Sequence, residues 1–352
     1  MKTGRTLGTL AAEVKRQSDA KRDFLADTSN LEMNTDGALV IPAHGTFPLT
    51  NHAQGQVADH LQIPRTYYQR MATQAPALLS QNVNTWMRHQ PEVRMVRTLD
   101  GEARAWLSNG YRRLDYADLM GALVPALADQ QAQVQSCEIT ETRLYLKAVT
   151  ATMEAKVRGD AVRAGVGVWG SEVGDGAVVV AGLLWVLACA NGAIVEQVVR
   201  QVHLGKRQKL NGFADEQAQE YASSRTQVLE DSAFWSRAQD GIRHVLSAEY
   251  FQHLVSRANE AADLKLEHPR HVVAVLAKRQ GLQQQQADAV LDALMAAGDT
   301  SAWGLSNAIT LASQQVDDYE QATAMERLGG QVITMAPQDW SAIAAEAGRL
   351  AA

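Results

Sequence analysis

The sequence predicts an α+β fold: a helical lead-in, a mainly antiparallel β-sheet core with packed helices, and a helical C-terminal part. Residues 92–187 show strand-forming residues of alternating polarity on either side of short turns, which is typical of antiparallel strands. Apolar residues recur at helical spacing before residue 90 and after residue 214. No G-x-G-x-x-G lies between a predicted strand and helix, and no P-loop is present, so a Rossmann-type sheet is not indicated. We therefore expect three parts, spanning residues 1–90, 91–213 and 214–352.

The first part, residues 1–90, is predicted to be helical. Residues 1–30 look like a polar, basic helix or arm, and a loop and a helix ending near Gln62 follow. The next helix is expected to start at Pro64, because proline fits the first turn of a helix. In the helix predicted over 76–90, an apolar face is expected to include Leu78, Leu79, Val83, Trp86 and Met87.

The central part, residues 91–213, carries the strand signals. Asp100-Gly101 predicts a tight hairpin between two strands over 92–108. A helix is expected over 114–130 with Asp115 as its cap. Residues 134–149 predict a second hairpin or one long strand, and 162–187 predict two more strands around a glycine-rich turn. The apolar run 176–195 is long enough to span a bilayer, but its glycines and β-branched residues favour a buried strand and its neighbour, so no membrane contact is expected.

The third part, residues 214–352, has almost continuous helical spacing. The predicted helices cover 215–238, 248–266, 270–280, 284–297 and 306–328. Pro269, Gly281 and Gly298 separate them, because proline and glycine interrupt helices.

Charge is distributed unevenly along the chain. The net charge is −6, yet residues 1–213 hold 23 Lys and Arg against 20 Asp and Glu, while residues 214–352 hold 10 against 19. This asymmetry predicts a basic working part and an acidic C-terminal part that limits non-specific binding or recruits a basic protein partner. The alternative is that the acidic helices are simply soluble ones. Two widely spaced cysteines and no signal-peptide pattern indicate a reducing, cytoplasmic location.

A basic face is expected on the central sheet. An antiparallel sheet with one face packed on helices leaves the other face free. Cations on such a face contact phosphates, and nearby rings stack on bases without sequence preference. The alternative is a solvated sheet face with a tryptophan in the core. The candidate contacts are Arg94, Arg97, Arg104, Arg112 and Arg113, with Trp106 and Tyr111 as stacking surfaces.

A second basic patch lies in residues 196–210. Lys206, Arg207 and Lys209 follow Arg200 without an intervening acidic residue, and such a group of cations suits phosphate binding. An exposed connector into the helical part is the equally plain alternative.

Metal and catalytic sites are not indicated by residue spacing. His44, His52 and His60 are separated by helix-breaking residues and lack carboxylate or cysteine ligands at suitable spacing, so no metal or cofactor is expected. Cys189 lies in the apolar run, where a buried inert thiol is the ordinary case, although a pairing with His203 remains conceivable. Paired carboxylates at Glu172 and Asp175 suit acid–base work, but acidic residues in a glycine-rich turn more often serve the turn.

Several motifs together resemble a known family. The motifs are "IPRTYYQRM" (63–71), "RAWLSNGYRRLD" (104–115), "WGSEVGDGA" (169–177), "CANGAIV" (189–195) and "VHLGKR" (202–207). Their order is similar to that in a family of phage- and plasmid-encoded proteins defined by a domain of unknown function. Family members commonly have Asn before "SE", where this chain has Gly170. The resemblance implies a mobile genetic element and, by analogy of fold, a similarity to single-strand annealing proteins of the Rad52 type.

Three functional hypotheses follow. The first is a non-enzymatic protein that binds and anneals single-stranded DNA in recombination, as a homo-oligomeric ring or filament. The second is a host-interaction or counter-defence protein that binds a protein target. The third is an enzyme with a site around Glu172, Asp175 and His203.

Overall fold

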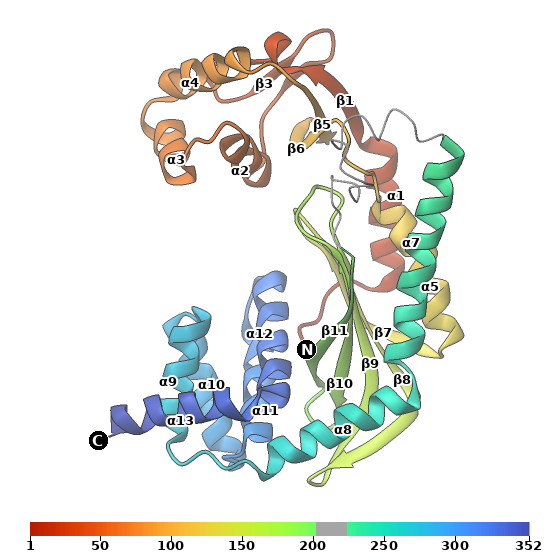
Figure 1. Ribbon diagram of the computed structural model, residues 1–352, viewed down its shortest axis with the longest axis vertical. Helices are drawn as coiled ribbons and strands as arrows, with labels where there is room; N and C mark the ends of the chain where they lie inside the picture. The colour runs from red at the N-terminus through yellow and green to blue at the C-terminus, as the bar shows by residue number, and fades with distance from the viewer. Residues whose placement is uncertain (202–223, 352) are drawn as a thin grey trace, which may run out of the picture.

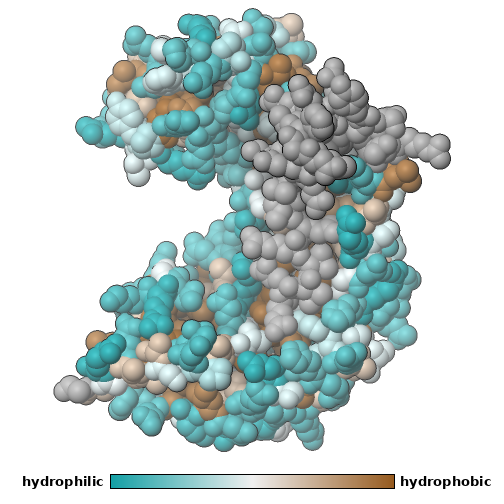
Figure 2. Space-filling model, in the orientation of Figure 1, coloured by the Kyte–Doolittle hydropathy of each residue, from teal (hydrophilic) through white to brown (hydrophobic). Residues whose placement is uncertain are grey.

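The chain forms a crescent of α+β architecture (Figure 1). The computed structural model describes residues 1–201 and 224–351. We call residues 22–108 the N-terminal lobe and the other described residues the body. The lobe is inserted between the first helix of the chain and α5, and a wide notch separates it from the C-terminal helices (Figure 2).

The N-terminal lobe contains two small antiparallel sheets and three helices. Its larger sheet has the order β1-β5-β6 and its smaller sheet the order β2-β3-β4. Leu39, Val57, Tyr68, Val83 and Trp106 contribute to a core of its own. The elements are β1 (Arg22–Asp27), β2 (Glu32–Met33), β3 (Leu39–Ile41), β4 (Gly45–Phe47), α2 (Asn51–His60), α3 (Arg65–Gln74), α4 (Pro76–His89), β5 (Val93–Leu99) and β6 (Glu102–Ser108).

The hairpin predicted at Asp100-Gly101 is confirmed. Both residues have positive φ, 52° for Asp100 and 84° for Gly101, which matches the twist that two-residue hairpins require. Val96 opposes Trp106 across the resulting β5–β6 pair.

The body is built on one five-stranded antiparallel sheet with the order β11-β10-β9-β8-β7. Alternate residues face opposite sides of the sheet, so Val166 and Val168 join the main core while Trp169 joins a smaller cluster on the other face. The apolar run predicted to be buried forms the two strands at one edge. The strands are β7 (Ala132–Ile139), β8 (Leu144–Val157), β9 (Asp160–Gly170), β10 (Val178–Val186) and β11 (Asn191–Gln201).

Helices cover both faces of this sheet (Figure 1). One side carries α1 (Leu7–Ala20), α5 (Tyr116–Asp129), α7 (Ser224–Val245) and α8 (Ala248–Asp263), and the other side carries α11 (Ala302–Ala312) and α12 (Tyr319–Thr334). Outside them lie α9 (Pro269–Gln280), α10 (Gln284–Ala297) and α13 (Pro337–Ala351). Asp115 is the N-cap residue of α5, as predicted. Among the described residues, none of the helices combines the length and apolarity needed to cross a bilayer.

The expected division at residues 90 and 214 does not match the packing. Strand β1 pairs with β5, so a boundary at residue 90 would cut one sheet. The first 90 residues also include four strands and are not a purely helical lead-in. Phe234, Phe251 and Trp303 share one core with the strands of the body, so the C-terminal helices are part of the same unit as the sheet.

The helix expected over 306–328 is wrong in its bounds. The chain instead forms α11 and α12 with a short 3-10 turn, Ser313–Gln315, between them. Asp318 caps α12 by accepting a hydrogen bond from the backbone of Gln321, which starts a new helix at that point.

Candidate functional site

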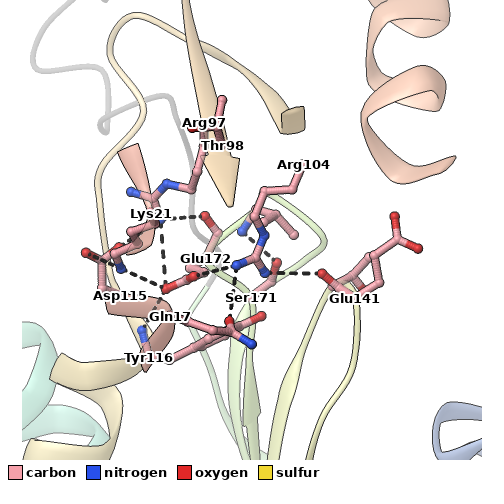
Figure 3. A network of polar contacts seen from close by, with 12 residues as sticks. Gln17, Lys21, Arg97, Thr98, Arg104, Asp115, Tyr116, Glu141, Ser171 and Glu172 are labelled. Atoms are coloured by element: carbon pink, nitrogen blue, oxygen red, sulfur yellow. Dashed lines mark hydrogen bonds and ion pairs between the residues drawn. The ribbon is translucent and has the colours of Figure 1, made fainter. Parts of the chain in front are cut away.

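A buried ionic cluster joins the N-terminal lobe to the body (Figure 3). Its centre is Glu172, in the loop 171–177 between β9 and β10, which we call the connector loop. The Glu172 side chain is 1% exposed. Its Oε1 atom lies 3.0 Å from Nη1 of Arg104, and its Oε2 atom lies 3.2 Å from Nζ of Lys21. The backbone N–H of Tyr116 also donates to Oε2, over 3.0 Å, so the carboxylate is fully engaged.

Arg97 forms the second half of this cluster. Its guanidinium donates to both carboxylate oxygens of Asp23, over 2.8 and 2.9 Å, and to Oδ1 of Asp115 over 2.7 Å. Burial lowers the pKa of Arg97, but the hydrogen bond to Asp23 and the attraction of Asp115 outweigh it and raise the pKa. Burial would raise the pKa of Asp115, and the attraction of Arg97 and Lys21 instead brings it below its ordinary value.

The charges in the cluster balance. Lys21, Arg97 and Arg104 face the carboxylates of Asp23, Asp115 and Glu172. Buried ions are tolerated in proteins when each is paired and hydrogen-bonded. These three cations are therefore paired within the cluster, and the exposed Arg113, which also lies 3.3 Å from Asp23, stands outside this balance.

The prediction of a free basic face on β5 and β6 is wrong. Arg97 and Arg104 are buried, because the connector loop brings Glu172 onto that side of the sheet. Trp106 is buried in the lobe core, and Tyr111 packs with Leu107 and Val173. Neither ring is exposed for stacking, because both faces of this small sheet are covered.

The remaining predicted arginines lie nearer the surface but are also paired. Arg94 binds Glu92, with 2.6 Å between Nη2 and Oε1. Arg112 binds Asp231, and its guanidinium lies 5.5 Å from the ring centroid of Phe234. Arg113 is the most open of them, with a side chain that is 52% exposed and 3.3 Å from Asp23. Lys206, Arg207 and Lys209 lie outside the described residues.

The residues of the enzyme hypothesis are also engaged. Oδ2 of Asp175 accepts a hydrogen bond from the Thr142 hydroxyl over 2.7 Å and lies 3.2 Å from Nη2 of Arg143. Glu172 is held inside the cluster, and His203 lies outside the described residues. Cys189, expected to be buried, is exposed in the turn between β10 and β11. Within residues 1–201 and 224–351, no group of His, Cys, Asp or Glu side chains could hold a metal ion.

The structure reveals a different exposed basic surface on α3 and α4. Residues 60–91 contain three arginines and no Asp or Glu. Tyr67 is 43% exposed and Trp86 is 46% exposed. Arg70 and Arg88 are exposed as well. We define the α3–α4 surface by its exposed side chains, which are Tyr67, Arg70, Leu78, Trp86, Arg88 and His89.

Leu78 and Trp86 were expected on the buried face of α4, and this is wrong. The buried stripe runs through Leu79, Val83 and Met87, one helical turn apart, and Leu78 and Trp86 lie outside it. The rings of Trp86 and His89 pack in a T-shaped arrangement, with 5.8 Å between the ring centroids. The lack of acidic residues over 60–91 is visible in the sequence and was the signal that could have located this surface.

Comparison with known proteins adds no assignment. No family model, curated protein or solved structure matches this chain.

Proposed function

We propose that this protein binds single-stranded DNA without enzymatic chemistry and that the α3–α4 surface is its main contact. The observation that carries the proposal is the coincidence of two features on adjacent helices. Exposed arginines occur without neighbouring acidic residues in the sequence, and two aromatic rings are exposed on the same two helices. Cations that track phosphates and rings that stack on bases are what sequence-tolerant binding of a single strand requires.

The local charge on this surface favours a polyanion despite the net charge of −6. Arg65 is paired with Asp59, which lies just before the acid-free stretch. In the part of the chain that the structure describes, the partner of Arg70 is the neutral Gln74 amide, whose Oε1 atom lies 3.2 Å from Nε. Arg88 lies in the last turn of α4, where it also complements the helix dipole. Arg70 and Arg88 are therefore available to a phosphate backbone.

The biological role that we propose is annealing during recombination of a mobile genetic element, with several subunits acting together. This role rests on the resemblance of the sequence motifs to phage- and plasmid-encoded proteins. Annealing involves no covalent step, which agrees with the engaged state of the Glu172 and Asp175 carboxylates.

A protein target is the second candidate. It is favoured by Leu78, which is 44% exposed on the same helix as Trp86. Exposed aliphatic and aromatic side chains together are typical of the central part of protein interfaces.

Fluorescence anisotropy of labelled oligothymidylate, titrated with the full chain at several salt concentrations, separates the two candidates. Phosphate contacts from Arg70 and Arg88 would give a slope of log K against log salt of about −1.4, which is two contacts at roughly −0.7 per neutralised phosphate of a single strand. Absence of binding at low salt would reject the DNA proposal and leave the protein-target candidate.

A further inference from the structure

The N-terminal lobe and the body have separate apolar cores. Val57, Tyr68 and Trp106 belong to the core of the lobe, whereas Val166 and Phe251 belong to the core of the body. A small cluster bridges them, formed by Met95, Ala105, Leu107, Tyr111 and Val173. Separate cores with a small shared contact are typical of units that can move relative to one another.

The backbone crosses between the two units at two adjacent places. One crossing follows α1 at Lys21, and the other precedes α5 at Asp115. Nζ of Lys21 lies 2.7 Å from Oδ2 of Asp115, so the two crossings are held side by side. Such paired crossings can act as a hinge, since a few residues at element ends absorb the change in backbone angles.

The connector loop makes a further, non-covalent contact between the units, in addition to the ion pair between Arg16 and Asp100 and the hydrogen bond from the backbone of His52 to Glu141. The carbonyl oxygen of Val173 lies 2.9 Å from Nε2 of His52 and 2.8 Å from Nε2 of Gln56, both on α2. Gly174 has a φ of +80°, and a Cβ atom there would lie 2.7 Å from the Leu107 side chain. The loop is therefore inserted tightly into the lobe, close to the crossings.

The Glu172 carboxylate accepts hydrogen bonds from both units, close to the two crossings. Arg104 belongs to β6 of the lobe, whereas Lys21 and the N–H of Tyr116 lie at the crossings. We propose that Glu172 is the latch of a hinge, which holds the notch between the lobe and the C-terminal helices at the width seen in Figure 2.

Loss of the Glu172 charge would weaken the contact between the lobe and the body and leave both apolar cores intact. Arg104 and Lys21 would then be buried with one carboxylate too few, and hydration of these cations would favour an opened joint. The apolar cores do not depend on this carboxylate, because their members pack within each unit. The lobe would then rotate as a rigid body about the paired crossings.

Distances between spin labels test the latch in the full chain. The labels are placed at Thr73→Cys on α3 and Asp317→Cys just before α12, both exposed, in a Cys189→Ser background. Cys137 is buried and stays in place. In Glu172→Gln the distance distribution is expected to broaden and to move to longer distances, while circular dichroism stays unchanged.

Glu326→Gln is the matched control. Glu326 is buried and pairs with Lys147 over 2.6 Å, but this pair lies wholly within the body. The control variant is expected to have a lower melting temperature than the parent. Its distribution of spin-label distances is expected to be the same as that of the parent. An unchanged distribution in folded Glu172→Gln, or equal broadening in the control, would overturn the latch. If Glu172→Gln does not fold, Lys21→Gln at the rim of the cluster decides by the same criterion.

Discussion

Arg104 on β6 and Glu172 in the connector loop form a buried ion pair across the joint, with 3.0 Å between Nη1 and Oε1. The two residues are 68 positions apart in the chain. Arg104, which the sequence predicts to be an exposed cation, is therefore buried and links the N-terminal lobe to the connector loop. The same loop also covers Arg97, whose Nη1 atom donates to the Glu172 carbonyl oxygen over 2.9 Å.

The Arg104–Glu172 pair should show strong energetic coupling. Either Arg104→Met or Glu172→Gln is expected to lower the free energy of unfolding by about 3–5 kcal/mol, because each leaves an uncompensated buried charge. The double variant should lose clearly less than the sum, since it removes one charge of each sign. Chemical denaturation of all four proteins measures the coupling. The exposed pair Arg5–Glu138 serves as the control and should couple by less than about 1 kcal/mol.

Asp115 should make stability depend on pH in the acidic range. Its pKa in the folded protein is below the unfolded value, mainly because Arg97 and Lys21 outweigh the effect of burial. Its contribution is therefore present above the unfolded pKa of about 3.9 and is lost as pH falls through the lower folded pKa. Asp115→Asn should be less stable than the parent at neutral pH, and the difference should shrink below about pH 4. A difference that stays constant from neutral to acidic pH would show that the carboxylate charge is not responsible.

Arg112 and Arg113 should differ in their effect on stability. Arg112→Ala loses the ion pair with Asp231 and the contact with the Phe234 ring, so a loss of about 1 kcal/mol is expected. Arg113→Ala should change stability by less than about 0.5 kcal/mol, because half of the side chain is exposed. Thermal melts compare the two. DNA affinity is expected to remain unchanged in both variants. A reduced affinity without a loss of stability would show that these arginines contact DNA after all.

Arg70 and Arg88 should contribute to DNA affinity without contributing to stability. Replacing both with glutamine should reduce the slope of log K against log salt by about 1.4, which corresponds to two contacts at roughly 0.7 each. The melting temperature should stay within a degree or so, because exposed substitutions rarely shift stability by more than about 0.5 kcal/mol. Arg270→Gln on α9 is the matched control, since Arg270 is exposed on the C-terminal helices. An equal loss in the control would indicate a general charge effect.

Local signals in the sequence predicted much of the fold. The Asp100-Gly101 turn, the Asp115 cap and the buried strands in 176–195 each depend on neighbours close in the chain. In the helix predicted over 114–130, Leu114, Leu119 and Leu123 are buried in the body core. These features follow from backbone preference and apolar periodicity, which act over short range.

Whether the predicted cations are exposed or buried depended on contacts between segments that are distant in the sequence. Asp23, the main partner of Arg97, is 74 positions away, and no periodicity reveals such a pair. The expectation of one free sheet face failed because the connector loop fills it. Trp86 and Leu78 were placed wrongly for a related reason, since the width of a buried stripe on α4 is set by what packs against it.

Photochemical crosslinking tests the central claim most directly. The full chain is bound to an oligonucleotide containing 5-bromodeoxyuridine, irradiated, digested and analysed by mass spectrometry. The account predicts crosslinks at Tyr67 or Trp86 that disappear at high salt, because stacking brings these rings against the bases. Crosslinks confined to the segment with Lys206, Arg207 and Lys209, or none with saturating oligonucleotide, would contradict a binding role for the α3–α4 surface.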